Sequence, residues 1–334
     1  MSIDASPVPA APPRQGRKIL VTAILAVFVF AGLSFLSDVR ALGDSLATFQ
    51  WRMLGIALAL VLGNYTLRFL RWQYLLNRLG VVVPAGTSAL VFLSGFIMSV
   101  TPGKMGEVFK SFLLWEYRGI SIARTASVVV AERLLDLVAL VLLVSLGSTA
   151  FEHGRAVAFA GGLVVFGIVL GCTVRPIGEW GLGLLGRIKL TARLTPKLRE
   201  AYDALHALTR PAPFLIGGLY ALLGWALECL ATWYLVQGFQ GAIIGWDGAT
   251  FSYAAGTLAG ALAMLPGGLG VAEVGMTSLF RAASPTLPAA TAAAATILVR
   301  LSTLWFGVAL GAVALFVLRA THTKQVATDA HPSA

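Results

Sequence analysis

Charged side chains occur inside stretches of this sequence that are otherwise apolar. Glu132, Arg133 and Asp136 fall within VVVAERLLDLVALVLL, and Arg300 falls within ATILVRLSTLW. Residues three or four apart lie on the same face of a helix, so Glu132 and Asp136 share a face and Arg133 can pair with Asp136. Such a cluster is either an ion-paired buttress between helices or a polar site that binds a charged group or moves a proton.

Two arginines at corresponding depths would suit a phosphate, because the guanidinium group binds phosphate with two hydrogen bonds and stays charged. We therefore predict Arg133 and Arg300 as phosphate ligands. Lys104 and Glu107 lie where a helix begins after a break, and free N–H groups at such a start attract anions. Lys104 is a third predicted phosphate ligand. Glu107 and Glu273 are either charge-balancing groups or partners of a helix dipole.

The composition indicates the environment in which these side chains are buried. The chain has 334 residues, of which 57% are apolar and only 12% are charged, and its mean hydropathy is +0.83. A soluble domain has about 25% charged residues, so we predict an all-α polytopic membrane protein. The two cysteines, Cys172 and Cys229, lie in apolar runs and indicate neither a disulfide framework nor a metal site. We expect no cofactor and no metal.

Six stretches are long enough to cross a bilayer, which takes about 20 apolar residues. They are 19–36, 51–76, 122–146, 156–174, 214–236 and 289–318.

Two further apolar stretches, 87–117 and 251–281, are interrupted at their centres by proline and glycine. Proline cannot continue a helix, and irregular backbone at membrane depth must be buried in protein or line a wet cavity. Each stretch is therefore two short spans or one re-entrant hairpin, and the short arms favour hairpins. The predicted helix breaks are Pro102, Gly103 and Gly106 in the first stretch, and Pro266, Gly267, Gly268 and Gly270 in the second.

The loop charges predict the orientation. With six spans and two hairpins, the loops on the side of both termini hold 16 Lys and Arg residues, and the other loops hold only Arg40 and Arg155. Positive charge stays in the cytoplasm, so both termini are expected there, in a cell inner membrane. The net charge of +10 then reflects cytoplasmic loops, and no nucleic-acid partner is expected.

The two broken stretches resemble each other and predict an internal repeat. Both contain P-G-x-x-G followed by a glutamate and a valine, and matched features are separated by 163 to 167 residues. A repeat unit with three spans must insert upside down after duplication, as in many transporters. The predicted organisation is a disordered cytoplasmic tail at 1–17, membrane repeats at 18–146 and 156–318, and a cytoplasmic tail at 319–334. A basic cytoplasmic segment, 175–213, lies within the second repeat and should contain a short surface helix.

Three other charged residues in the predicted spans have less specific interpretations. Arg68 and Arg71 lie near the end of the second span and are expected to reach the cytoplasmic surface. Glu228 is a lone acid that either pairs with an arginine or carries protons.

Three strings in the sequence resemble a known family. SGFIMSVTPGKMGEVFKSFLL, VVVAERLLDLVALVLL and AMLPGGLGVAEVG are similar to the lysylphosphatidylglycerol synthase transmembrane region, the flippase-like family, over about residues 18–318. The resemblance implies movement of a modified lipid between leaflets. It assigns the family pattern to the following residues: Pro102, Gly103, Lys104, Gly106, Glu107, Glu132, Arg133, Asp136, Pro266, Gly267, Gly268, Gly270 and Glu273.

The resemblance does not extend to the synthase domain that full-length members append, so we expect no enzymatic activity. The favoured hypothesis is translocation of a phosphate-bearing lipid or glycolipid headgroup, with Lys104, Arg133 and Arg300 binding it. Glu107, Glu132, Asp136 and Glu273 would balance charge, accept a cationic headgroup or couple protons. The alternatives are an accessory subunit of a lipid-modifying or glycosyl-transferring membrane enzyme, with 175–213 as its docking surface, and a membrane-embedded enzyme using Glu132 and Asp136.

Overall fold

The computed structural model describes residues 39–100, 107–152, 154–176, 179–180 and 195–330. Every regular element in these ranges is helical, which confirms the predicted all-α class. Four helices are long and apolar enough to cross a membrane: α3 (Arg52–Arg78), α7 (Gly154–Thr173), α11 (Pro211–Gln237) and the continuous helix Ala289–Thr321. They agree with the predicted spans to within a few residues. The predicted span 19–36 lies outside the described residues.

Helix α6 (Ile122–Gly147) occupies the predicted third span and carries the charged cluster. It packs mainly against α7, α11, α12 (Trp246–Leu262) and α10 (Thr195–Leu208). Because it is surrounded, 15 of its 26 residues are buried, and Glu132 and Asp136 are among them. This environment is the one in which intramembrane charge is tolerated.

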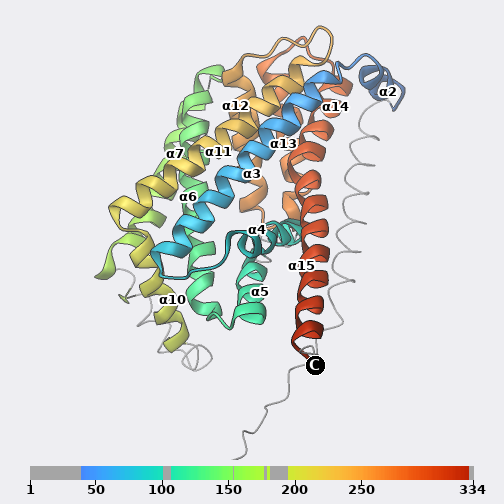
Figure 1. Cartoon of the computed structure of the whole chain (residues 1–334). Coiled ribbons are helices and arrows are strands. Elements are labelled where there is room, and N and C mark those ends of the chain that lie inside the picture. Colours follow the sequence, from blue (N-terminus) through green and yellow to red (C-terminus); the bar gives the residue numbers. More distant parts are fainter. Residues whose placement is uncertain (1–38, 101–106, 153, 177–178, 181–194, 331–334) are drawn as a thin grey trace, which may run out of the picture.

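Helices α3 and α11 pack side by side along their length (Figure 1). A Cβ atom added to Gly224 would lie 3.2 Å from Nδ2 of Asn64, and one added to Gly63 would lie 3.1 Å from Cδ1 of Leu227. Small residues at a crossing let two backbones approach, which is the usual basis of helix association in lipid. The second and fifth predicted spans are thereby held together.

Both broken stretches consist of short helices. The first comprises α4 (Ala85–Ser94), the 3-10 turn η1 (Gly95–Val100) and α5 (Phe109–Arg118). The second comprises α12, the turn η4 (Pro266–Gly268) and α13 (Val271–Ala283). Their helical arms have 10 to 17 residues, fewer than the about 20 that usually cross a bilayer.

The turn η1 in the first stretch meets the break in the second stretch. Turn η1 contacts turn η4, and a Cβ atom added to Gly267 would lie 3.6 Å from Cα of Val100. In Figure 1, α5 lies in the lower half of the view and α12 and α13 lie in the upper half. Gly267, Gly268 and Gly270 have φ angles of 62°, 68° and 87°, which only glycine adopts without strain. This confirms the predicted break at Pro266–Gly270.

The last long helix is interrupted beside the charged cluster. Helix α14 (Ala289–Arg300) continues through a π-helical turn, η5 (Leu301–Trp305), into α15 (Phe306–Ala330). In a π-helical turn, each backbone N–H bonds the carbonyl five residues earlier and not four. Thr303 lies in this turn, and its carbonyl accepts a 2.5 Å hydrogen bond from the hydroxyl of Tyr65. Such π turns often occur at functional sites. The helix also continues beyond the predicted end of the span at residue 318.

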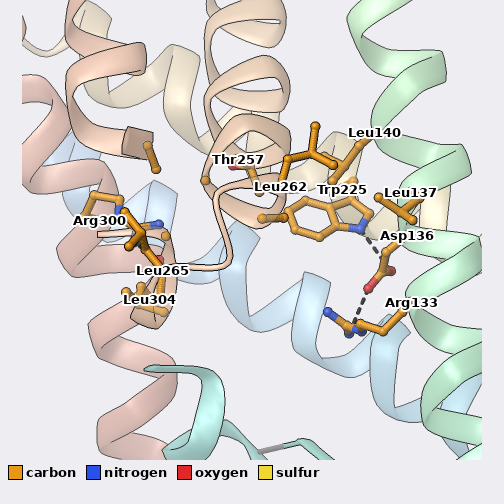
Figure 2. A pocket seen from close by; sticks show the side chains of 15 residues that line it. Arg133, Asp136, Leu137, Leu140, Trp225, Thr257, Leu262, Leu265, Arg300 and Leu304 are labelled. Carbon is orange, nitrogen blue, oxygen red and sulfur yellow. Dashed lines mark hydrogen bonds and ion pairs between the residues drawn. The ribbon is translucent and has the colours of Figure 1, made fainter. Parts of the chain in front are cut away.

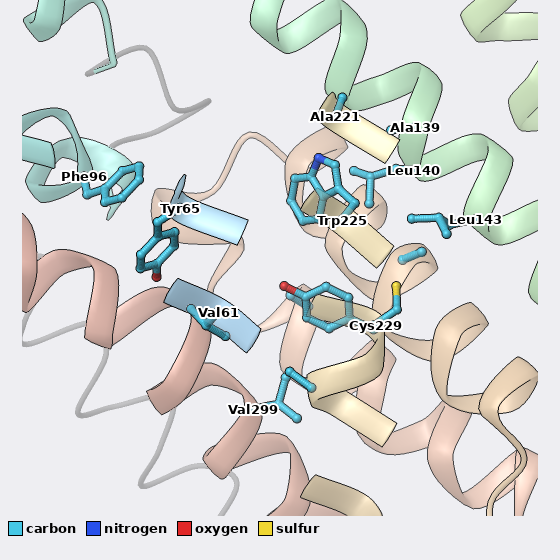
Figure 3. Packing of buried hydrophobic residues seen from close by; sticks show 14 of the residues in the cluster. Val61, Tyr65, Phe96, Ala139, Leu140, Leu143, Ala221, Trp225, Cys229 and Val299 are labelled. Atoms are coloured by element: carbon cyan, nitrogen blue, oxygen red, sulfur yellow. The ribbon is translucent and has the colours of Figure 1, made fainter. Parts of the chain in front are cut away.

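The core joins α3, α6, α11 and α14, as Figure 3 shows for Val61, Leu140, Trp225 and Val299. Two peripheral helices complete the fold. Helix α2 (Val39–Ala47) packs against α14, and α10 is the helix expected in the basic segment. Because Leu205 and Leu208 are buried, α10 is docked on α6 and is not merely a surface helix.

Candidate functional site

Asp136 on α6 is the centre of a buried ion network. Its Oδ1 atom lies 2.7 Å from Nη1 of Arg71 and accepts a 3.0 Å hydrogen bond from Nε1 of Trp225. Its Oδ2 atom lies 2.8 Å from Nη2 of Arg133, so the predicted pair between residues three apart is present. Three donors from α3, α6 and α11 converge on this carboxylate, which stabilises its charge.

The position of Arg71 contradicts the prediction that it reaches the membrane surface. Its side chain is fully buried and connects Asp136 with Glu132, whose Oε1 atom lies 3.8 Å from Nη2 of Arg71. The cost of burying a guanidinium group is offset only when carboxylates surround it. Arg71 is therefore a member of this network, and the sequence interpretation missed its role.

Lys110 on α5 is a second residue that the sequence interpretation missed. Its Nζ atom lies 2.6 Å from Oε2 of Glu132 and 4.4 Å from the ring centroid of Trp72. A Cβ atom added to Gly95 would lie 2.5 Å from Cγ of Lys110, so the lysine stem passes directly over this glycine. The first broken stretch is thus fixed to α6 by a buried ion pair.

Glu107 also joins the first broken stretch to α6. Its Oε2 atom lies 3.0 Å from Nη2 of Arg133. Glu107 is buried, and the side chain of Arg133 is 25% exposed. Glu107 is therefore an ion-pair partner of Arg133, and its charge-balancing role stays a prediction. The neighbouring predicted residues Pro102, Gly103, Lys104 and Gly106 lie outside the described residues.

Glu273 and Arg300 form a separate network at the second break. Nε of Arg300 lies 2.6 Å from Oε1 of Glu273, and Nη2 donates a 2.6 Å hydrogen bond to the carbonyl of Gly267. The other carboxylate oxygen accepts a 2.6 Å hydrogen bond from the backbone N–H of Gly270, which precedes α13. Glu273 therefore caps a helix start, as predicted, and also pairs with the arginine that the sequence placed opposite Arg133.

Arg133 and Arg300 line the same cavity, which has a volume of about 240 Å³. Figure 2 shows Arg133 and Asp136 on one side, Arg300 on the other and Trp225 between them. The remaining walls are mostly leucines from α6, α12 and the π turn, together with Gly267 and Gly268. Leu262 and Leu265 line the cavity and are 69% and 42% exposed. The cavity thus combines three charged side chains with mostly apolar walls, and two of its leucines form an exposed apolar rim.

A second cavity of about 60 Å³ adjoins the first. The two share Trp225, Thr257, Arg300 and Leu304 as wall residues. The smaller one is lined on its other sides by charged and hydroxyl groups, including Arg68, Glu107, Glu228 and Tyr253.

Arg68 and Glu228, which border this second cavity, both contact aromatic side chains. The phenol of Tyr253 donates a hydrogen bond to Oε2 of Glu228, and the guanidinium group of Arg68 lies 5.2 Å from the ring centroid of Phe96. Arg68, like Arg71, faces the interior and not the surface that the sequence suggested.

The charged side chains around these cavities are balanced. In the described ranges, which do not include Lys104, five are basic and five are acidic: Arg68, Arg71, Lys110, Arg133 and Arg300, and Glu107, Glu132, Asp136, Glu228 and Glu273. Within the part of the chain that the structure describes, no group of three His, Cys, Asp or Glu residues could hold a metal ion. The arrangement is suited to exchanging ion-pair partners with a charged guest.

A model of the lysylphosphatidylglycerol synthase TM region matches residues 23–311. The match includes both broken stretches and every charged residue of the two cavities. A comparison with curated proteins finds no match.

Proposed function

The chain belongs to the family of the lysylphosphatidylglycerol synthase TM region, and on this premise we propose that it moves a phosphate-bearing lipid headgroup between membrane leaflets. The family and the long apolar helices establish a multi-pass membrane protein related to lipid modification or flipping. The finer assignment is supported by one observation in particular. Two arginines from distant parts of the sequence line a single cavity beside the break at Pro266–Gly270.

The arginines would bind the phosphate by exchanging partners. Arg133 contacts Glu107 and Asp136, and Arg300 contacts Glu273. A phosphate oxygen offers the same charge and geometry as a carboxylate oxygen, so a guanidinium group can contact both at little additional cost. Lys104 remains the third proposed ligand.

The apolar rim supports a lipid as the guest. Leu262 and Leu265 connect the charged interior of the cavity with the outer surface of the helix bundle. Acyl chains could stay in the surrounding bilayer and cover this rim while the headgroup is in the cavity. Burying the rim against hydrocarbon is favourable, whereas exposing it to water is not.

The two short-armed stretches would provide the movement. We propose that they are re-entrant hairpins of an inverted repeat, as in many transporters, with the headgroup site where they meet. Rocking of one half against the other would open the cavity first to one leaflet and then to the other. Glu107, Glu132, Asp136 and Glu273 would keep the charge balanced during this change.

We further propose that the protein is not an enzyme and acts in the inner membrane with both termini in the cytoplasm. Eight of the ten charged side chains placed around the cavities in the described ranges pair with one another. Headgroup chemistry would then be performed by a different protein.

The test is translocation by purified protein in vesicles of phosphatidylcholine with 20 mole per cent phosphatidylglycerol, roughly the content at which an anionic surface is well developed. A fluorescent phosphatidylglycerol is followed by its accessibility to a quencher that does not cross the membrane. Arg300→Gln combined with Glu273→Gln removes a whole ion pair, which avoids an uncompensated buried charge.

The Arg300→Gln/Glu273→Gln protein should lose translocation and keep its thermal stability in detergent. Arg281→Gln, which changes an exposed arginine at the end of α13, is the matched control and should translocate normally. Wild-type translocation by the double variant would contradict the proposal. A wild-type protein that binds the lipid without moving it would favour the accessory-subunit alternative.

A further inference from the structure

Thr257 on α12 has a buried hydroxyl group that no protein atom in the described ranges contacts by a hydrogen bond. Its residue exposure is 9%. Burying a hydroxyl without a partner is unfavourable, and such groups in native proteins usually have a functional explanation. Ser111 is the other buried hydroxyl of this kind among the described residues, but it borders neither of the two cavities.

The conformation of Thr257 differs from that of nearby buried hydroxyls. Buried serine and threonine residues in helices commonly bond the carbonyl one turn earlier. Ser252 on the same helix does so at 2.7 Å, and Thr232 on α11 does so at 2.9 Å. Thr257 makes no such bond, so its hydroxyl remains available to the space it faces.

That space is the boundary between the two cavities. Thr257 belongs to the shared wall with Trp225, Arg300 and Leu304, and Figure 2 shows it above the loop that leads to Leu265. Trp225 already donates its indole N–H to Asp136, and Arg300 donates to Glu273 and to the carbonyl of Gly267. On this wall, the hydroxyl of Thr257 is the polar group that no protein atom of the described ranges engages.

We propose that Thr257 is a specificity-determining residue that donates a hydrogen bond to a phosphate oxygen of the guest between the two cavities. This inference rests on the proposed function and adds a neutral ligand to the charged ones. An unprotonated phosphate oxygen only accepts hydrogen bonds, so the hydroxyl acts as the donor. A lipid headgroup and a free phosphate share this chemistry.

The experiment measures binding to purified protein in detergent with two probes, dihexanoylphosphatidylglycerol and inorganic phosphate. Thr257→Val removes the hydroxyl and keeps the shape, and Thr257→Ser keeps the hydroxyl. Thr257→Val should bind roughly ten- to a hundredfold more weakly, the effect of one hydrogen bond to a charged group. Thr257→Ser should stay within about threefold of the wild type. The probe that binds more tightly identifies the source of the phosphate.

Two comparisons separate this inference from the proposed function. Thr232→Val removes an equally buried hydroxyl that has a backbone partner, so it should lower thermal stability without changing binding. Thr257→Val should not lower stability, because no protein hydrogen bond is lost. The inference is overturned if Thr257→Val binds like the wild type while Arg300→Gln/Glu273→Gln does not, or if Thr257→Val loses as much stability as Thr232→Val. The proposed function fails as well if neither probe binds the wild type or if Arg300→Gln/Glu273→Gln binds normally.

Discussion

Arg71 on α3 and Asp136 on α6 form a 2.7 Å ion pair that is buried on both sides. The two residues are 65 positions apart in the chain, so the contact depends on how α3 crosses α6. Trp225 and Arg133 complete the environment of the carboxylate. Because Asp136 also lines the larger cavity, the ion pair links α3 to the cavity wall on α6.

Arg71→Met should lower the free energy of unfolding by about 3–5 kcal/mol, because it leaves part of the buried carboxylate charge uncompensated. Thermal unfolding in detergent measures the effect. Arg52→Met changes an exposed arginine in the first turn of the same helix and should be nearly neutral. If Arg71→Met and Arg52→Met lowered the unfolding temperature equally, the buried ion pair would not contribute to stability.

Lys110→Met should be similarly destabilising, because Glu132 would lose its 2.6 Å partner. The loss should again be about 3–5 kcal/mol. Adding Glu132→Gln should recover most of it, since a neutral amide needs no counter-charge. A double-mutant cycle on unfolding free energies checks this. Additive losses from the two substitutions would show that the side chains do not interact.

Gly267→Ala should lower the free energy of unfolding by about 1–3 kcal/mol, because a residue other than glycine is strained in the left-handed conformation that this turn requires. Its φ angle is 62°, and the added Cβ atom would also approach Cδ2 of Leu304 at 3.4 Å. Gly167→Ala in α7, where an added Cβ atom meets nothing within 4 Å, should be neutral or stabilising. Unfolding midpoints of the two variants provide the comparison. A Gly267→Ala protein as stable as the wild type would show that this turn does not require glycine.

Trp225→Phe should cost more stability than Trp233→Phe. Trp225 donates to the carboxylate of Asp136 at 3.0 Å, and Trp233 donates to the neutral carbonyl of Ile244 at 3.1 Å. Hydrogen bonds to charged groups contribute about 1.5–3 kcal/mol, and neutral ones about 0.5–1.5 kcal/mol. Denaturant titration of both variants measures the difference. The reverse order would indicate that Asp136 does not need the indole N–H.

The spans and breaks could be predicted from the sequence because they depend on local properties. Hydropathy located α3, α7 and α11, and the Pro-Gly cluster located the break before α13. The pair between Arg133 and Asp136 also followed from helix geometry alone. These features need no information about which helices are neighbours.

The partners of the other charged residues could not be predicted in this way. Arg71 and Lys110 find their carboxylates on α6, and only the packing of three helices brings them together. A signal for α3 was present, however. Asn64, Arg68 and Arg71 are separated by four and three residues, so they form one polar face. That pattern favours an inward-facing stripe over arginines that extend to the membrane surface.

The charges around the cavities have an electrical consequence. The five acidic and five basic side chains of the described ranges cancel, and Lys104, the third proposed ligand, would add one positive charge to the empty interior. An anionic headgroup with one negative charge would neutralise it, and each uncompensated charge couples to about 2.3 kcal/mol per 100 mV. Voltage would therefore act on the return of the empty protein and leave the loaded step to thermal motion.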